Sequence, residues 1–251
     1  MIRNLALLLS LAGVAWCGPL VEEKVDHAGA RFRVVRATPE QLQVVWKNPD
    51  GVPYRSFDQV QAAFSKQGKT ITFLMNAGIF EPGGIPSGLH VENRRELHAL
   101  NLADAPGNFF LKPNGVIWIE AAGAKREAFI APSEAFKKRG DALHLMSSRW
   151  LECAVQSGPL LLDNGRRHPA FHQNSSSKLH RNGVGIDADG HIVFAITDRG
   201  QEINLWDFAG LFLKLGCNNA LFLDGDISQS AVNPTKPIQS NQFGAIFVIA
   251  E

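Results

Sequence analysis

The sequence lacks an excess of either charge. Its 251 residues include 25 Lys and Arg against 24 Asp and Glu. Proteins that bind a nucleic-acid backbone usually carry a clear basic excess, so this balance argues against a nucleic-acid partner. It leaves room for an enzyme that acts on a small anionic group, because a single arginine can hold such a group.

Common metal and nucleophile motifs are also missing. There is no Cys-x-x-Cys pair and no His-Glu-x-x-His motif, and Pro169 disfavours a helix that would align His168 with His172. Ser157 lacks the Gly-x-Ser-x-Gly elbow of a serine nucleophile. The sequence therefore predicts no zinc site and no serine nucleophile, and we expect no required cofactor.

Cysteine is scarce, with three residues in the chain. Cys17 lies in the N-terminal segment, which leaves Cys153 and Cys217 as a pair. An even pair can form a disulfide in an oxidising compartment, and two separate buried thiols are the alternative.

Long hydrophobic runs are absent except for a short one near the start. Arg3 precedes an apolar run of about a dozen residues, too short to span a bilayer. Ala15 and Cys17 are small residues placed as at a signal peptidase site before Gly18. This pattern predicts a signal peptide over residues 1–17 and export to the periplasm or the extracellular space. The alternative is that Cys17 carries a lipid. No transmembrane span is expected, and nothing indicates an oligomeric state.

Short strand-like segments dominate residues 18–251, which we interpret as one domain. Each is rich in β-branched and aromatic residues and is bounded by turn-forming residues. Asn114-Gly115 and Asp189-Gly190 predict hairpin turns. The predicted strands are Phe32–Val35, Leu42–Trp46, Thr70–Met75, Phe109–Lys112, Val116–Glu120, Ala154–Gln156, Leu160–Leu162, Gly183–Asp187, His191–Thr197, Ala220–Leu223 and Gly244–Ile249.

Three segments have helical patterns. One begins at a capping box formed by Ser56 and Gln59, one spans Pro132–Arg139 and ends at Gly140, and one runs from Asn204 to Gly216. Helices and strands do not alternate strictly. The predicted class is therefore α+β, with a mixed or mostly antiparallel sheet.

Polar residues follow apolar strands at five places, where binding sites are commonly built. Asn76 and Gly78 end the first strand, and Asn108 precedes the second. Gln156 and Ser157 stand before a Gly-Pro corner. Each has a structural alternative, and for Asn76 this is a simple turn.

The last two junctions carry charge. Arg181 opens a Gly-Val-Gly strand, where its planar fork can hold two phosphate oxygens; a surface ion pair is the alternative. Asp224 ends a four-residue apolar run and is followed by Gly225, Asp226 and Ser228. A carboxylate there can act as an acid or a base, or can cap its own turn. Asp224 and Asp226 also have the chemistry to hold a divalent cation.

Taken in order, these motifs resemble the phosphodiester glycosidase family. The matching segments are Asn76-Ala77-Gly78-Ile79-Phe80, Gln156-Ser157-Gly158-Pro159, Arg181-Asn182-Gly183-Val184-Gly185, the helix from Asn204 to Gly216, and Asp224-Gly225-Asp226-Ile227-Ser228. The resemblance is to an exported bacterial branch and covers about residues 70–249. Ala77 and Asp226 depart from the family pattern, which often has glycine at both positions.

The resemblance implies hydrolysis of a sugar linked through its anomeric carbon to a phosphodiester. It implies that Asp224, Arg181 and Asn76 are central, and that Gly78, Gln156, Ser157, Gly225, Asp226, Ser228 and Asn108 contact the substrate or shape its pocket. Two other functions stay open: a non-catalytic module that binds glycan or envelope, and a cation-dependent phosphodiesterase built on Asp224 and Asp226.

Overall fold

The computed structural model describes residues 20–143 and 150–251. The predicted signal peptide lies outside these residues. Three helices and four sheets are formed in the described part, and every strand pairing there is antiparallel. The α+β prediction is therefore confirmed, in its mostly antiparallel form. None of the helices within these two ranges is long and apolar enough to cross a membrane.

The largest sheet has seven strands in the order β1-β2-β15-β14-β16-β12-β13. Their bounds are Glu22–His27, Ala30–Ala37, Ile192–Thr197, Asn182–Asp187, Cys217–Phe222, Leu160–Asp163 and Arg166–Arg167. A five-stranded sheet has the order β10-β9-β11-β7-β8, with bounds Lys125–Pro132, Gly115–Ala122, Leu151–Ser157, His90–Glu92 and Arg95–His98.

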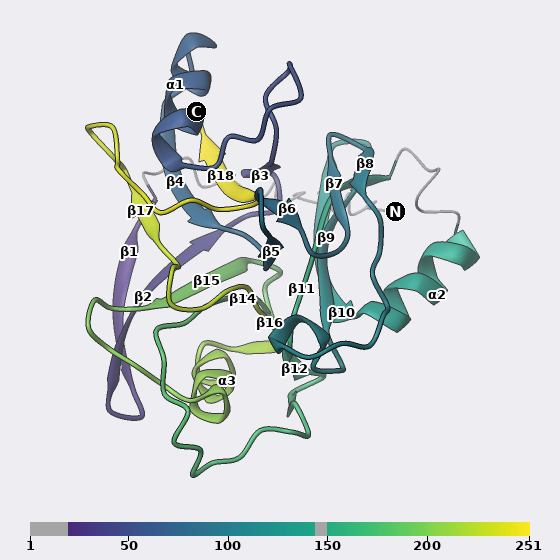
Figure 1. Ribbon diagram of the computed structural model, residues 1–251, viewed down its shortest axis with the longest axis vertical. Helices are drawn as coiled ribbons and strands as arrows, with labels where there is room; N and C mark the ends of the chain where they lie inside the picture. Colours follow the sequence, from purple (N-terminus) through teal and green to yellow (C-terminus); the bar gives the residue numbers. More distant parts are fainter. Residues whose placement is uncertain (1–19, 144–149) are drawn as a thin grey trace, which may run out of the picture.

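A four-stranded sheet has the order β17-β4-β18-β3, with bounds Ser230–Val232, Ile71–Asn76, Ile246–Ala250 and Leu42–Val45. A small hairpin pairs β5 (Phe80–Glu81) with β6 (Ile85–Pro86). Each helix covers a different sheet (Figure 1). Helix α1 (Phe57–Lys66) packs on the four-stranded sheet, α2 (Ser133–Leu143) on the five-stranded sheet, and α3 (Leu205–Lys214) on the seven-stranded sheet.

The three large sheets share one hydrophobic core. In β15, Ile192, Phe194 and Ile196 face this core, while Val193 and Ala195 face α3. Strands β4, β9 and β18 alternate in the same way between the shared core and their own helix. Side chains alternate along a strand, so a strand that is covered on both sides needs apolar residues throughout. This is why these segments are continuous apolar runs in the sequence.

Several local predictions are confirmed. Asn204 caps α3 and accepts a hydrogen bond from the Asp207 backbone amide at 2.8 Å. The turn at Gly190, with φ of 84°, joins β14 to β15 as the sequence predicts. Cys153 and Cys217 are both free and buried, so the alternative of two separate thiols is correct.

Other local predictions are wrong. Residues Phe109–Lys112 form no strand, because a 3-10 turn spans Asn108–Phe110 and the Asn114 side chain donates to the Phe109 carbonyl. The hairpin predicted at Asn114-Gly115 is therefore absent. Gly140 does not end its helix, since α2 runs through it to Leu143.

The start of α1 differs in its hydrogen bonding. Ser56 precedes the helix as predicted but makes no side-chain cap with a backbone amide. Its hydroxyl bonds to the Asp58 carboxylate instead, so the predicted capping box with Gln59 does not form. Asp58, the second residue of the helix, thus binds the Ser56 hydroxyl that a capping box would direct to a backbone amide.

Candidate active site

The candidate site is built around the turn formed by residues 224–228, which we call the Asp224 turn. It leaves the end of β16 on the seven-stranded sheet, beside the start of β14, since Gly183 pairs with Phe222. Apolar residues up to Leu223 are fully buried, so the chain delivers Asp224 from the core to the edge of the sheets. Asp226 and Ile227 are exposed, whereas Ser228 is buried again.

Polar side chains from other elements hold the backbone of this turn. Asn182, at the start of β14, accepts from the Asp224 amide at 2.8 Å. Asn76, at the end of β4, accepts from the Gln229 amide at 2.9 Å. Asn241 donates to the Ile227 carbonyl at 2.8 Å. These hydrogen bonds come from three separate parts of the chain. Because β14 and β4 belong to different sheets, the turn lies where the seven-stranded and four-stranded sheets meet.

Asn76 is the centre of this network. It is 2% exposed, and its amide nitrogen lies 3.2 Å from the Ser228 hydroxyl. Asn182 donates to both oxygens of Asn76, at 3.2 and 3.3 Å. Every polar atom of the Asn76 side chain is therefore occupied, so the residue positions the turn from within the protein.

Asp224 has an unusual environment for a carboxylate. Its pKa is raised to about 6, mainly by burial; a hydrogen bond from the Gly225 amide opposes the rise, and the negative charge of Asp226 adds to it. A carboxyl group with such a pKa is present in both protonation states between pH 5 and 7, which suits proton transfer.

Gly225 faces open space. A Cβ added at this position would meet no atom within 4 Å, and Gly225 has no positive φ. Backbone conformation therefore does not require glycine here. This open space lets another molecule approach the backbone of the turn closely at Gly225, next to Asp224.

Arg181 is fully buried in the structure, so the surface ion pair that the sequence left open as an alternative is not formed with any described residue. Its Nε donates to the Ile203 carbonyl at 2.9 Å and one terminal nitrogen to the Ser177 carbonyl at 3.2 Å. Its other terminal nitrogen, Nη1, is buried without a hydrogen-bond partner among the described residues. Burial lowers its pKa to about 10, and Asp226 partly offsets this effect. Nε and one terminal nitrogen are thus hydrogen-bonded to the protein, and Nη1 is the buried guanidinium nitrogen that lacks an acceptor.

Gly78, which follows β4, lies against Ser157 and its neighbours at the end of β11. The Ser157 hydroxyl donates to the Leu223 carbonyl at 2.7 Å and accepts from the Ile79 amide at 3.3 Å. A Cβ on Gly78 would lie 2.6 Å from the Gln156 carbonyl oxygen. Ser157 therefore fixes the backbone that leads into Asp224, and Gly78 lets the chain after β4 pass close to β11. The Ser157 hydroxyl is not free to attack a substrate.

Gln156 and Asn108 lie apart from the Asp224 turn. Neighbouring side chains of a strand point to opposite faces, so Gln156 points away from the Ser157 contacts. It accepts from the amides of Leu89 and Asn101 and donates to Asn101 and Ser133. Asn108 is exposed on the 3-10 turn beside Gly158.

We expect Gln156→Ala to lower the free energy of unfolding by about 2 to 3 kcal/mol, because it leaves the buried amide of Leu89 and the half-buried amide of Asn101 unpaired. Urea unfolding measures this value. Gln59→Ala, at an exposed position of α1, is the matched control and should change it by less than about 0.5 kcal/mol. A loss below about 1 kcal/mol for Gln156→Ala would contradict the assignment.

Three site residues were not predicted from the sequence: Asn182, His180 and Thr197. Asn182 and His180 flank Arg181 in the motif that drew attention to the arginine, but their partners are distant in the chain. His180 lies between Thr197 and the Ser228 carbonyl. The signal that the sequence offered for Asn182 was its place as a polar residue directly before an apolar strand.

A group with metal-ligand chemistry lies elsewhere. Within residues 20–143 and 150–251, Asp187, Asp189 and His191 have ligand atoms within 4.8 Å of one another. They occupy the β14–β15 turn, at the opposite end of β14 from Asn182. One Asp187 oxygen accepts the amides of Asp189 and His191, and the other faces Arg36 at 3.7 Å. Turn geometry and this ion pair account for the cluster.

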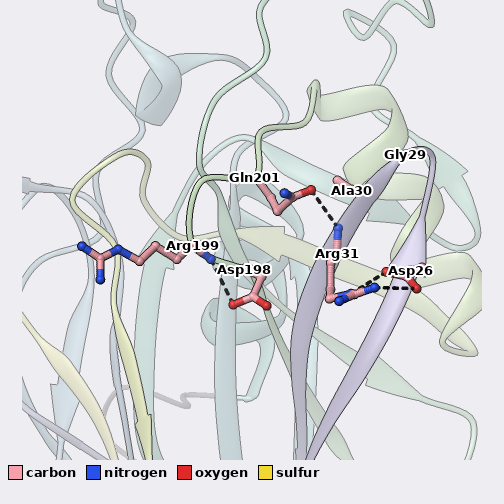
Figure 2. Close-up of a pocket in the computed structure, with 7 residues that line it drawn as sticks. All are labelled: Asp26, Gly29, Ala30, Arg31, Asp198, Arg199 and Gln201. Carbon is pink, nitrogen blue, oxygen red and sulfur yellow. Dashed lines mark hydrogen bonds and ion pairs between the residues drawn. The ribbon is translucent and has the colours of Figure 1, made fainter.

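Surface hollows also lie away from the Asp224 turn. One of them, of about 430 Å³, lies between the β1–β2 turn and residues 198–201. Figure 2 shows its lining side chains, with Arg199 extending away from the others. Asp26 pairs with Arg31, and Asp198 pairs with Lys24. Most of its charges are thus neutralised within the protein. Two others, of about 510 and 360 Å³, lie beside α1 and β10.

Comparison with known proteins agrees with the order of motifs. The family model for phosphodiester glycosidase matches residues 69–246. The chain belongs to the phosphodiester glycosidase family. Its match includes Asn76, Arg181 and the Asp224 turn. This family member is 36% identical over 195 residues to the uncharacterized protein YigE of Escherichia coli K12, covering 77% of this chain and 70% of that protein.

Solved structures share the fold of this phosphodiester glycosidase family member. The catalytic domain of zebrafish N-acetylglucosamine-1-phosphodiester α-N-acetylglucosaminidase, auto-inhibited by its pro-peptide, has a TM-score of 0.64 at 14% identity, over 94% of this chain and 85% of that one. A putative exported protein of Burkholderia pseudomallei has a TM-score of 0.55 at 12% identity, over 88% and 74%. At these identities the likeness shows the fold.

Proposed function

We propose that this protein is an exported hydrolase that cleaves the glycosidic C–O bond of a sugar-1-phosphodiester in envelope or extracellular glycan. The observation that carries the proposal is Asp224: a carboxyl group with a pKa of about 6, next to open space at Gly225, on a turn held by Asn76 and Asn182. Membership of the phosphodiester glycosidase family supports the reaction class.

In the proposed reaction, water attacks the anomeric carbon. Asp224 in its ionised form takes the proton of this water as the new C–O bond forms. The bond between the anomeric carbon and the bridging oxygen breaks, and its electron pair leaves with the phosphate monoester. A phosphate is a good leaving group, so no strong acid is needed on that side.

Arg181 supplies positive charge for the departing phosphate. A cation beneath the turn stabilises negative charge that develops on the leaving group, and it does so strongly where water is excluded. Two of its nitrogens are held by main-chain carbonyls, so a single nitrogen, Nη1, acts on the phosphate. The Ser228 hydroxyl donates to a substrate oxygen.

A cation-dependent phosphodiesterase is the rival reaction, because Asp224 and Asp226 are neighbours in the chain. The described residues bring no third histidine, cysteine or acidic ligand to these two, so a cation would depend on substrate and water for its remaining ligands.

Hydrolysis in oxygen-18 water distinguishes the candidate functions. Purified protein is incubated with a panel of sugar-1-phosphodiesters, including nucleotide sugars, with and without a chelator. We expect the label in the sugar, with no effect of the chelator. Label in the phosphate that disappears with chelator would establish the rival reaction. Binding without turnover of any substrate would instead indicate a glycan-binding module.

The rate should depend on the ionisation of Asp224. We expect kcat/KM to fall as the pH drops below about 6, because protonation removes the base. A pH profile from 4.5 to 8.5 measures this. Asp226→Asn should shift the acid limb to lower pH, because it removes a negative charge that raises the Asp224 pKa. An unchanged limb in this variant would assign the titration to another group.

A further inference from the structure

His180 connects three elements through its two ring nitrogens. It precedes β14, and its Nδ1 lies 2.7 Å from the Thr197 hydroxyl at the end of β15. Its Nε2 lies 3.1 Å from the carbonyl oxygen of Ser228 in the Asp224 turn. The half-buried ring therefore bridges the central strands of the seven-stranded sheet and the turn.

The partners decide which nitrogen carries the hydrogen. A carbonyl oxygen only accepts, so Nε2 donates to Ser228. In the neutral ring Nδ1 then accepts, and the donor is the Thr197 hydroxyl. The oxygen of that hydroxyl accepts from the Arg181 backbone amide at 3.0 Å. A directed chain thus runs from the Arg181 amide through Thr197 and His180 to Ser228.

The Asp224 turn has few hydrogen bonds of its own. The Ser228 amide donates to the Gly225 carbonyl, and the Gly225 amide donates to the Asp224 carboxylate. Asp226 is exposed, and the space beside Gly225 is open. The position of Ser228 therefore depends on outside contacts: His180 on its carbonyl, Asn76 on its hydroxyl and on the following Gln229 amide, and Asn241 on the preceding Ile227 carbonyl.

The contacts of His180 and Asn76 fix the position of the Ser228 hydroxyl. It is buried and accepts from Asn76, and its own hydrogen is not used in a bond to any residue that the structure describes. We propose that His180 is a positioning residue that holds Ser228, and with it the Asp224 turn, in place for the substrate. This inference rests on the proposed function. A displacement of about 1 Å in such a group can cost about 100-fold in rate.

Two substitutions separate positioning from general packing. His180→Gln keeps an N–H donor near the Nε2 position, whereas His180→Phe keeps the ring shape and removes both hydrogen bonds. His172→Phe, at an exposed position of the preceding loop, is the matched control. We expect His180→Phe to lower kcat about 100-fold with KM within about threefold, and His180→Gln to recover most of the loss.

Amide hydrogen exchange tests the same contact without a substrate. The peptide that covers residues 224–229 should exchange at least about tenfold faster in His180→Phe than in wild type, and near the wild-type rate in His180→Gln. Unchanged exchange and unchanged kcat in His180→Phe would overturn the inference, as would equal loss of kcat and melting temperature in both variants. If wild type shows the protected turn but hydrolyses no sugar phosphodiester, the proposed function fails and the positioning of the turn stands.

Discussion

Asp224→Asn should lower kcat for a sugar-1-phosphodiester by about 1,000-fold, since removal of a general base typically costs between about 100- and 10,000-fold. The amide keeps the shape of the side chain but cannot take a proton from water. Steady-state kinetics on the substrate identified by isotope labelling measures the loss. Asp189→Asn makes the same chemical change at an exposed position and should leave kcat unchanged. Retention of more than a tenth of the activity in Asp224→Asn would remove Asp224 from the mechanism.

The same variant should be more stable than wild type at neutral pH. The folded pKa of Asp224, about 6, lies above its ordinary value of 3.8, so the folded state binds this proton more tightly than the unfolded chain. Stability is then lost as the pH rises from about 4 to 6, and the ionised group is a cost of up to about 3 kcal/mol above that window. Asparagine avoids this cost. Urea unfolding at pH 7.5 and pH 4.5 should show a clearly larger gain at the higher pH, because only part of the cost has developed at pH 4.5.

Arg181→Met should lower kcat/KM about 100-fold or more, because it removes the positive charge beneath the departing phosphate. Its effect on the free energy of unfolding should stay below about 2 kcal/mol. Two carbonyl acceptors lose their donor, but the protein no longer buries a cation, and these effects oppose each other.

Arg181→Lys and Arg199→Lys complete this comparison. Lysine at position 181 keeps the charge and should recover part of the activity, while Arg199 is exposed and its replacement should have no effect. Kinetics and urea unfolding are measured on the same preparations. A large loss of stability in Arg181→Met, with full activity in the folded fraction, would show that the arginine has a structural role alone.

These expectations rest on a site whose parts differ in how far the sequence predicts them. The apolar run before Asp224, the Asn204 cap and the turn at Gly190 are local features. In each, neighbours in the chain supply the contacts, so residue type and spacing are sufficient. The alternation of β15 side chains between its two faces is also local, because successive residues of a strand point to opposite sides.

Other features depend on partners far along the chain. Asn182 bonds to Asn76, 106 residues away, and His180 bonds to Ser228, 48 residues away. Strand β1 was not predicted, because it is highly charged and lacks an apolar pattern. It is held to β2 in part by Arg33–Glu22 and Arg36–Glu23 ion pairs. No local pattern identifies such pairings.

The sequence by itself determined the fold class, the family and the order of the motifs. Only the tertiary structure decided what each polar residue does: Gln156 turns away from the site, Ser157 holds the backbone, and Arg181 is buried. The physical reason is that a strand sends adjacent side chains to opposite faces, and the partner on each face comes from a distant element. The raised pKa of Asp224 also depends on the tertiary structure. Burial by surrounding elements disfavours the ionised form of its carboxyl group, and the local sequence does not show this burial.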